Sequence, residues 1–493
     1  MSSLPPLPNE AYSAAIAYLY DRINYEKTTD SPYHQQNFRL SRMERLLVEL
    51  DHPQQAAPVI HIAGSKGKGS VAWLMASCLQ RNGYRTGLYT SPHLLRLEER
   101  FVVDGVPISP AGLVQAVAAV RPAAEKIASH GHGHATFFEL TTAMAWWYFR
   151  QQGCNACVIE VGLGGRLDST NVCWPTLSMI TSISYDHQAQ LGNTLTEIAG
   201  EKAGIIKPGV PVVSGATHPE AAAVIQRVAR ERGCLLRELD RDFSGTAVPV
   251  EQGRVGACVF DYRPLQPHWS TSQPRRQVEL RLLGRHQIAN ACLVLASLDI
   301  LAEQGWQLEE SKIREALRHT QVPGRIQSVA DHPLTIVDTA HNEASVEALI
   351  TTLAEYYPDR RRSLVFSASR DKQWKRMLDQ LLPNFDRLIL TQFRLNPRAV
   401  PVETLHRYAE EWKLRSTAPG LVEGRGDRSI QTRDHPPQLA MALTPAEALK
   451  LAQQWTGEDE LLVIAGSFFL AAEVLEALRE IKGQCNTNNA KTE

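Results

Sequence analysis

Short apolar runs alternate with helical patterns along most of the chain, and this alternation is the feature that most constrains the fold. A helix between two strands returns the chain to the same end of the sheet, so the strands lie parallel. The pattern therefore predicts an α/β fold with a largely parallel sheet. The expected strands of the first series are Pro58–Gly64, Arg85–Thr90, Ala156–Val161, Leu177–Ser184 and Val210–Ser214, with helices at Ser70–Gly83, Thr141–Gln152, Thr194–Ile206 and His286–Gly305.

A second β/α series follows a candidate boundary at Gln321–Gly324. The 493 residues exceed a typical single domain, so more than one folding unit is expected. We expect an N-terminal domain at 1–321 and a smaller Rossmann-like domain at 322–493. The strands expected in the second series are Leu334–Asp338, Ser363–Ser367, Leu388–Thr391 and Leu461–Ala465, with helices at Ala344–Tyr357, Lys372–Leu382, Val402–Lys413 and Pro445–Trp455.

Three segments depart from this rhythm. Within residues 240–280, the proline-rich and polar stretch Arg263–Arg276 predicts an excursion or flap before a half-buried strand at Gln277–Leu283. The polar stretch Ser416–Gln438 predicts a loop. Leu461–Leu478 is strongly apolar but contains a glycine and two glutamates, so it predicts a strand followed by a helix and not a membrane span.

The composition is that of an ordinary soluble globular protein, with 43% hydrophobic and 21% charged residues. The net charge of −1 argues against a nucleic-acid partner, although a local basic cleft is compatible with it. Met1–Tyr20 lacks a basic start followed by an apolar core, so no secretory signal is expected. The eight cysteines are scattered among apolar segments, and for Cys154 and Cys157 core filling is preferred over a redox pair or half a zinc site. We expect a cytoplasmic protein with no membrane partner.

A glycine-rich segment, His61–Ser70 (HIAGSKGKGS), lies between the first expected strand and helix and is called the phosphate loop below. Glycines let the backbone approach a polyphosphate, while amides at the helix start and Lys68 offset its charge. The hydroxyl of Ser70 could bind phosphate or magnesium. The spacing differs from GxxxxGK[ST], because Gly69 separates Lys68 from Ser70, and a simple glycine-rich turn is the alternative.

Polar residues follow three further expected strands. Ser91 belongs to TSPHL, Glu160 begins EVGLGGRLDSTN, and His187 belongs to DHQAQLG. Because α/β folds gather ligands at the carboxyl ends of their strands, these side chains could form an oxygen-rich magnesium site beside the phosphate loop. Each also has an ordinary explanation: a turn serine, a capped surface acid and a hydrogen-bonded core histidine.

Taken together, HIAGSKGKGS, TSPHL, GLGGRLDSTN, DHQAQLG, EKAGIIKPG, HQIANA and PGR resemble folylpolyglutamate synthase and dihydrofolate synthase, which belong to the Mur ligase superfamily. The resemblance covers roughly residues 15 to 475. It implies a P-loop N-terminal domain, a Rossmann-like C-terminal domain and ATP between them. The implied reaction is ATP-dependent addition of L-glutamate to folates, with dihydropteroate as a further possible substrate, in a monomer that requires Mg²⁺.

The resemblance also implies roles for individual residues, and it makes Lys68, His187 and Lys202 the catalytic ones. Lys202 matches a lysine that relatives carry as a carbamate, which would turn a cation into an anionic ligand; a solvated helix lysine beside Glu201 is the ordinary alternative. The matched ATP-binding residues are Gly67, Lys68, Gly69, Ser70, Asn290, Arg325, Asp338 and His341; the magnesium ligands are Ser91, Glu160, His187 and Lys202; and the folate-binding residues are Phe138, Arg166, Leu167, Asp168 and Ser169.

Two motifs depart from the family pattern. The phosphate loop reads GSKGKGS where GTNGKGS is usual, which adds the charge of Lys66. Asp338–Glu343 reads DTAHNE where DGAHNP is common, so Thr339 replaces a glycine and Glu343 a proline. The second departure leaves the local backbone shape and ligand affinity open. Two rival functions also stay open: another Mur-type amino-acid ligase, and a nucleotide-binding scaffold that has lost catalysis.

Overall fold

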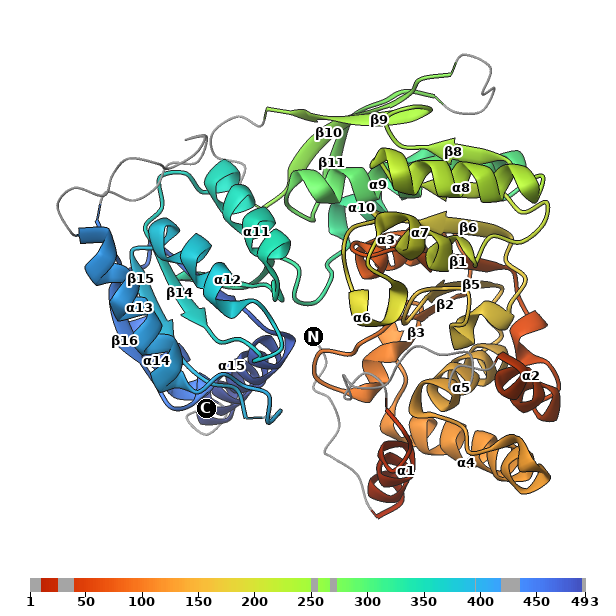
Figure 1. The fold of residues 1–493 in the computed structure, drawn as a ribbon, viewed down its shortest axis with the longest axis horizontal. Coiled ribbons are helices and arrows are strands. Elements are labelled where there is room, and N and C mark those ends of the chain that lie inside the picture. The colour runs from red at the N-terminus through yellow and green to blue at the C-terminus, as the bar shows by residue number, and fades with distance from the viewer. Residues whose placement is uncertain are drawn as a thin grey trace. The chain divides into compact units, whose positions relative to one another are not determined.

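The computed structural model describes residues 10–24, 40–249, 256–266, 273–394, 396–417 and 435–489 (Figure 1). The chain forms two compact units. The N-terminal unit comprises residues 1–250, 259–281 and 286–320, and the C-terminal unit comprises residues 251–258, 282–285 and 321–493. Both are built from helices packed on a mostly parallel sheet, which confirms the predicted α/β class.

The N-terminal unit is organised on an eight-stranded sheet of order β4-β3-β2-β5-β1-β6-β7-β8. Six consecutive strands, from β2 to β8 in that order, are parallel, and the short β3 and β4 add an antiparallel edge. The strands are β1 (Val59–Ala63), β2 (Thr86–Tyr89), β3 (Phe101–Val103), β4 (Val106–Pro107), β5 (Ala156–Glu160), β6 (Leu177–Ile180), β7 (Val212–Ser214) and β8 (Leu236–Glu238).

Helices cover this sheet through apolar clusters. Helix α3 packs across β1, β2 and β5, while α4 and α5 share a core with β1, β2 and β5 that includes the buried Cys154 and Cys157. The two CxxC thiols are therefore core residues, as predicted. The helices of this unit are α1 (Glu10–Tyr20), α2 (Leu40–Glu49), α3 (Lys68–Arg81), α4 (Pro110–Ile127), α5 (Phe137–Gln151), α6 (Gln188–Leu191), α7 (Leu195–Ala203), α8 (Pro219–Glu231), α9 (Arg285–Glu303) and α10 (Glu310–His319).

A three-stranded sheet of order β11-β10-β9 occupies most of the segment predicted to be irregular. Its strands are β9 (Phe243–Val248), β10 (Cys258–Pro264) and β11 (Arg275–Leu280). The predicted excursion at Arg263–Arg276 is therefore too long at both ends, since β10 continues to Pro264 and β11 begins at Arg275; residues 267–272 lie outside the described residues. The predicted strand at Gln277–Leu283 is present as β11, which begins two residues and ends three residues earlier, whereas β9 and β10 were not predicted.

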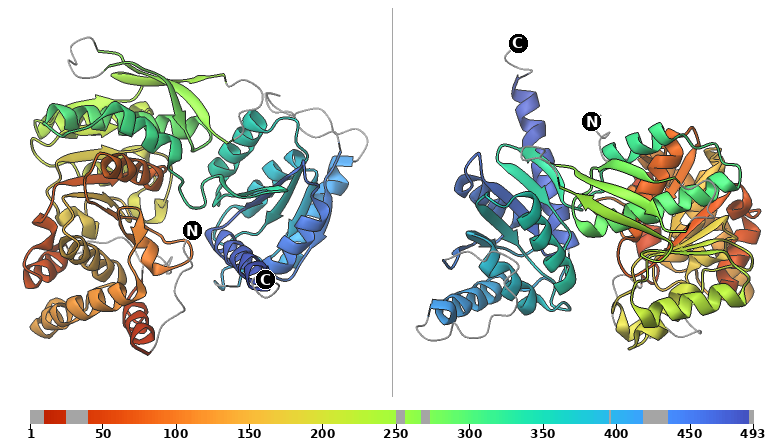
Figure 2. Two further views of the ribbon diagram at one scale, coloured as in Figure 1. Left: turned by 180° about the vertical axis from the view of Figure 1, so that it is seen from behind. Right: turned by 90° about the horizontal axis from the view of Figure 1, so that it is seen from above.

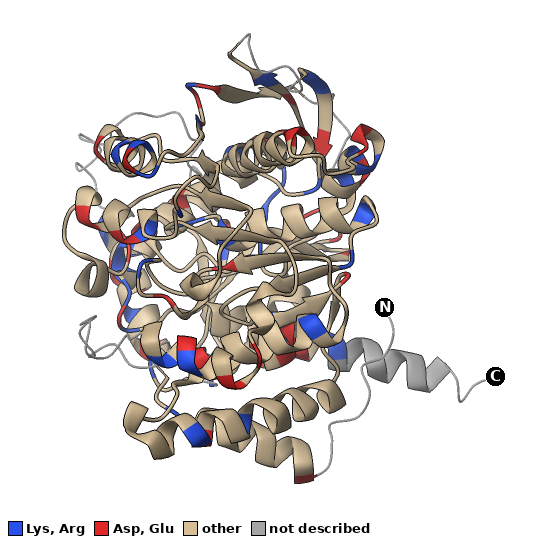
Figure 3. Cartoon of the chain, turned by 90° about the vertical axis from the view of Figure 1, so that its right-hand side faces the viewer, with Lys and Arg blue, Asp and Glu red and all other residues tan. Residues whose placement is uncertain are grey.

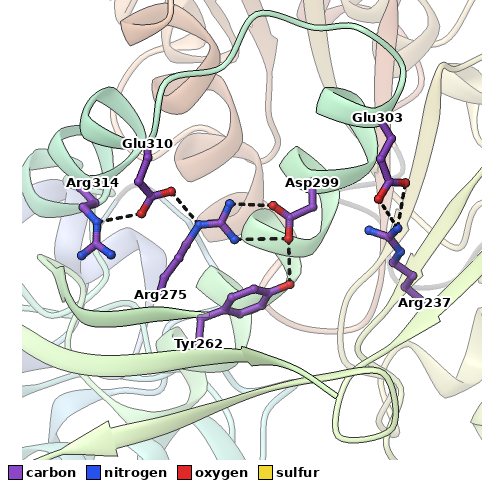
Figure 4. Close-up of polar contacts among 7 residues, drawn as sticks. All are labelled: Arg237, Tyr262, Arg275, Asp299, Glu303, Glu310 and Arg314. Atoms are coloured by element: carbon purple, nitrogen blue, oxygen red, sulfur yellow. Dashed lines mark hydrogen bonds and ion pairs between the residues drawn. The ribbon is translucent and has the colours of Figure 1, made fainter. Parts of the chain in front are cut away.

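Ionic contacts attach this small sheet to α9 and α10 (Figure 4). Arg275 of β11 donates to Asp299 of α9 at 2.6 Å and to Glu310 of α10 at 2.7 Å. Tyr262 of β10 donates to the same Asp299 carboxylate at 3.2 Å. Because removal of Arg275 would leave the buried Asp299 carboxylate without its charge partner, loss of this arginine should weaken the attachment of the sheet to α9.

The C-terminal unit has a six-stranded sheet of order β12-β13-β17-β14-β15-β16, parallel except for the edge strand β12. Helices α11, α12 and α13 share one apolar cluster with it, and α14 and α15 pack together against β14 and β17 (Figure 2). The elements are β12 (Gln327–Asp331), β13 (Leu334–Val337), β14 (Arg362–Phe366), β15 (Arg387–Leu390), β16 (Gln438–Met441), β17 (Leu461–Ala465), α11 (Glu343–Tyr356), α12 (Trp374–Leu381), α13 (Val402–Thr417), α14 (Pro445–Trp455) and α15 (Phe468–Asn489).

The predicted strand and helix at Leu461–Leu478 are present as β17 and α15, and no described helix is long and apolar enough to cross a membrane. The predicted loop at Ser416–Gln438 lies largely outside the described residues, since α13 reaches Thr417 and β16 begins at Gln438. Basic and acidic residues are interspersed over the side drawn in Figure 3.

Candidate active site

The phosphate loop joins β1 to α3 in a conformation that only glycine adopts without strain. Gly67 precedes α3 at a φ of 89°, and a Cβ atom built there would lie 2.5 Å from Oδ1 of Asn290. Lys68, Gly69 and Ser70 are the first three residues of α3, so their amides are among those that the helix leaves without an internal partner. The loop therefore presents backbone donors and the positive end of a helix dipole, which suits an anionic ligand.

Two lysines converge on one carbonyl oxygen of this loop. Lys68 Nζ donates to the Gly64 oxygen at 3.0 Å, and Lys202 Nζ of α7 donates to the same oxygen at 2.8 Å. Lys202 is only 3% exposed, and burial, followed by the charge of Lys68, lowers its pKa to about 7. The solvated helix lysine considered from the sequence is therefore wrong, because this amine is buried beside the phosphate loop.

Ser91 and Glu160 are also brought together. The Ser91 amide donates to Oε2 of Glu160 at 3.1 Å, and a Cβ atom built on Gly69 would lie 3.7 Å from the same oxygen. Glu160 ends β5 and is 4% exposed, so it is not a surface acid. The carboxylate lies between the TSPHL segment and the start of α3, where an anionic oxygen ligand can face a nucleotide's metal.

His187 lies on the loop that follows β6, immediately before the first residue of α6, and its backbone has a left-handed φ of 49°. Its Nε2 atom is 3.8 Å from a carboxylate oxygen of Asp186, and about half of its side chain is exposed. The core-histidine alternative is therefore wrong. Because β2, β5, β1 and β6 are adjacent and parallel, the segments that carry Ser91, Glu160, the phosphate loop and His187 leave the sheet at the same edge.

The GLGGRLDSTN loop, residues 162–171, packs against α5. The ring of Phe138 covers Gly162 so closely that a Cβ atom there would lie 2.4 Å from it. Arg166 pairs with Glu201 at 2.8 Å, beside Lys202, and its backbone amide donates to the Glu201 carbonyl oxygen at 2.8 Å. The five residues predicted to bind folate are thus Phe138 and four residues of one loop that its ring contacts.

Asp168 shapes this loop from inside. Its carboxylate accepts from the Leu163 amide at 2.9 Å, from the Thr170 amide at 3.0 Å and from the Thr170 hydroxyl at 2.5 Å. Burial raises the pKa of Asp168, while the bond from Thr170 opposes that rise.

Sequence reasoning missed a further buried partner, His61 of β1. Its Nε2 atom lies 2.9 Å from the Thr170 hydroxyl oxygen. Since the hydroxyl proton goes to Asp168, His61 must be the donor, and burial keeps the imidazole neutral by lowering its pKa to about 3. A lone polar residue in an otherwise apolar strand was the only signal in the sequence.

In the C-terminal unit, Asp338 and Arg325 hold one turn. The Asp338 carboxylate accepts from the Ile326 amide at 2.9 Å and from the Ala340 amide at 2.7 Å, and Arg325 bonds to the Thr339 hydroxyl. Burial raises the pKa of Asp338, and the charge of Arg325 counters this. His341 Nδ1 contacts the Thr339 carbonyl oxygen at 2.9 Å.

The local backbone accommodates both Thr339 and Glu343 of the DTAHNE motif. Thr339 has no left-handed φ, so glycine is not required there. Glu343 is the first residue of α11, where an acid interacts favourably with the helix dipole and a proline would also fit because of its fixed φ. Asn342 caps the helix by accepting a hydrogen bond from the Ser345 amide at 3.0 Å.

The described residues contain no group of three or more His, Cys, Asp or Glu side chains that could hold a metal ion by themselves. A metal at this edge would therefore need hydroxyl, phosphate or water oxygens besides Glu160. Mg²⁺ commonly binds in this way, through one or two carboxylates plus substrate phosphates and water.

Family models match both units. Residues 62–298 match the Mur ligase middle domain, and residues 324–468 match the Mur ligase glutamate ligase domain. Together these matches include residues 62–70 of the phosphate loop and the whole DTAHNE motif.

Relatives match nearly the whole chain. It is 36% identical to a folylpolyglutamate synthase of Lacticaseibacillus casei over 95% of this chain and 98% of that protein. It is 32% identical to a dihydrofolate synthase/folylpolyglutamate synthase of Bacillus subtilis, over 89% of this chain and 95% of that one. Among solved structures, the folylpolyglutamate synthase of Thermotoga maritima matches with a TM-score of 0.79 at 30% identity, over 95% of this chain and 97% of that one. An Escherichia coli relative in complex with DHPP and ADP matches with a TM-score of 0.77 at 25% identity, over 98% of this chain and all of that one.

Proposed function

Because the chain belongs to the folylpolyglutamate synthase and dihydrofolate synthase family of Mur ligases, we propose that it joins L-glutamate to folates with ATP. The chain is an ATP-dependent ligase. The observation that carries the substrate assignment is the match to a folylpolyglutamate synthase over nearly the full length of both chains. The phosphate loop, Glu160 and Lys202 lie close together in one unit, which supports the transfer of phosphate from ATP that this reaction needs.

The reaction needs activation of a carboxylate, because oxide is too poor a leaving group for direct attack by an amine. Transfer of the γ-phosphate of ATP gives an acyl phosphate and ADP. The glutamate amine then attacks the acyl carbon, and phosphate leaves as the amide forms. Phosphoryl transfer of this kind depends on positioning and charge neutralisation, and it requires no protein nucleophile. The α3 amides and Lys68 are the groups of this chain that provide both.

The residues at the strand ends fit a magnesium ion. Glu160 is buried, is oriented by the Ser91 amide and lies against Gly69 of the phosphate loop, which suits a hard cation shared with phosphate oxygens. Ser91, Glu160 and His187 would hold the ion, with Lys202 as a carbamate. Magnesium, when bound, neutralises phosphate charge and helps to orient the γ-phosphate.

The other assignments complete the proposal. Phe138 and residues 166–169 bind the folate, and Asn290, Arg325, Asp338 and His341 bind ATP. The domains are 1–321, which carries the phosphate loop, and 322–493, a Rossmann-like ligase domain. The protein works as a cytoplasmic monomer on small-molecule substrates and does not require nucleic acid.

A paired assay tests the function. Phosphate release should depend on L-glutamate together with tetrahydrofolate, and the parallel reaction with dihydropteroate decides whether the chain is bifunctional. UDP-muramyl substrates serve as the control and should give no turnover. Activity only with the muramyl substrates would establish the rival Mur-type ligase, and ATP binding without turnover on any substrate would establish the inactive scaffold.

Replacement of the proposed metal ligands should shift the magnesium dependence. We expect Glu160→Gln and His187→Ala each to lose about 10- to 100-fold in magnesium affinity or initial rate, because each removes a ligand that positions the γ-phosphate. The measurement is a magnesium titration of the initial rate. Glu238→Gln and His218→Ala are matched controls: Glu238 ends β8 of the same sheet and is also 4% exposed, and His218 precedes α8. An unshifted magnesium dependence in both ligand variants would place the metal elsewhere.

A further inference from the structure

Thr339, which replaces the glycine common in relatives, makes three contacts just after β13. It is fully buried, and its amide donates to the Gly324 carbonyl oxygen at 2.9 Å. Its hydroxyl donates to the same oxygen at 3.1 Å and accepts a hydrogen bond from Nη1 of Arg325. The hydroxyl is thus used as donor and acceptor at once, which fixes its direction.

Arg325 is held on two sides. Besides the bond to Thr339, its guanidinium carbon lies 5.3 Å from the centre of the Phe468 ring, in a cation–π contact. The nearby Asp338 carboxylate accepts backbone amides of Ile326 and Ala340. The directional hydrogen bond that Arg325 donates to Thr339 therefore complements a ring contact and a charge attraction to Asp338, which are less directional.

A glycine at position 339 would leave the backbone bond to Gly324 in place but could not hold the guanidinium. An arginine side chain loses considerable rotamer freedom when it binds a ligand, so fixing it beforehand favours binding. We propose that Thr339 is a positioning residue that orients Arg325 toward the nucleotide. This inference rests on the proposed function, in which Arg325 contacts ATP.

The test measures ATP affinity by direct titration of the full chain, without folate or turnover. Arg325→Met should weaken ATP binding about tenfold or more. Thr339→Val, which keeps the shape and removes the hydroxyl, should weaken it about 3- to 10-fold, while Thr339→Ser should stay near wild type. In the Arg325→Met background, Thr339→Val should have no further effect, since it acts through that arginine.

Thr352→Val is the matched control. Thr352 is a buried threonine of α11 in the same unit, whose hydroxyl donates to the Ala348 carbonyl oxygen at 2.7 Å. Removal of this hydroxyl should leave ATP affinity unchanged, so any general loss of stability in the unit is accounted for.

The outcomes separate the inference from its premise. If Arg325→Met leaves ATP affinity unchanged, the proposed nucleotide contact of Arg325 is wrong and the inference falls with it. If Arg325→Met weakens binding but Thr339→Val does not, or if Thr339→Val acts equally in both backgrounds, the positioning role is overturned while the proposed function stands. Because no folate is present, failure of the folate assignment would not alter the result.

Discussion

Lys68→Ala should abolish ATP-dependent turnover and leave the fold intact. Lys68 is the cation of the phosphate loop at the start of α3, and removal of one such preorganised charge costs about 10²- to 10³-fold or more in rate. Without ATP, its hydrogen bond to the Gly64 carbonyl oxygen is worth only about 1 kcal/mol net. Its loss also relieves the repulsion of Lys202. The thermal unfolding temperature of the free protein should therefore change little.

The measurements are the initial rate at saturating substrates and thermal unfolding with and without ATP. ATP should stabilise the wild type much more than the variant, because at a given concentration a ligand of the folded state stabilises it more the more tightly it binds. Lys312→Ala, which removes an exposed lysine of α10, should behave like the wild type in both measurements. Near-normal activity of Lys68→Ala would remove the phosphate-loop assignment, and a large fall in unfolding temperature would mean that Lys68 is chiefly structural.

The geometry around Lys68 was largely accessible from the sequence. The strand β1, the helix α3 and the residues that follow β2, β5 and β6 each had a local signal, either an apolar run or a glycine-rich turn. The rule that ligands gather at the carboxyl ends of parallel strands then brought Ser91 and Glu160 to one edge. The hydrogen bond between the Ser91 amide and Glu160 confirms that these two residues lie close together, although it does not test their role as magnesium ligands.

Other features had no local signal. The hydrogen bond between His61 and Thr170 joins residues that are 109 positions apart, so no local sequence pattern could predict it. Helix α4 contains Pro122, which weakens the sequence pattern of a helix, yet tertiary packing maintains it. The contacts of Thr339 with Gly324 and Arg325 depend on a turn whose shape the DTAHNE motif alone could not specify.

The second large effect on activity is expected from replacement of Lys202, which we predict to be carbamoylated and essential. A neutral amine can react with carbon dioxide, which forms a carbamate and releases a proton, whereas an ammonium group cannot. Burial of Lys202 beside Lys68 lowers its pKa from 10.5 to about 7, so a substantial neutral fraction exists at neutral pH. Carbamoylation should therefore increase as the pH rises through about 7 and fall below it.

The same pKa shift predicts how stability depends on pH. In buffer free of carbon dioxide, the unfolded chain binds the Lys202 proton up to about pH 10.5 and the folded chain only up to about pH 7. Between these values the unfolded state binds more protons, so the free energy of unfolding should rise with pH. Lys202→Met keeps the apolar stem, removes the titrating amine and should abolish this contribution. It therefore serves as the folded reference for the activity measurements.

Lys202→Ala should lose nearly all activity, and bicarbonate or a short carboxylic acid should restore part of it by occupying the vacated space with an anionic oxygen. Lys202→Arg should be inactive, because guanidinium keeps its charge and cannot form a comparable carbamate. Wild-type protein held at neutral pH under carbon dioxide and then trapped chemically should show the added carboxyl group on Lys202, and Lys202→Met should not.

Since Lys202 donates to the Gly64 carbonyl oxygen at 2.8 Å, a buried cation that merely stabilises the phosphate loop is the competing explanation. Full activity of Lys202→Arg would establish that explanation, because the position would then require positive charge and not a carbamate.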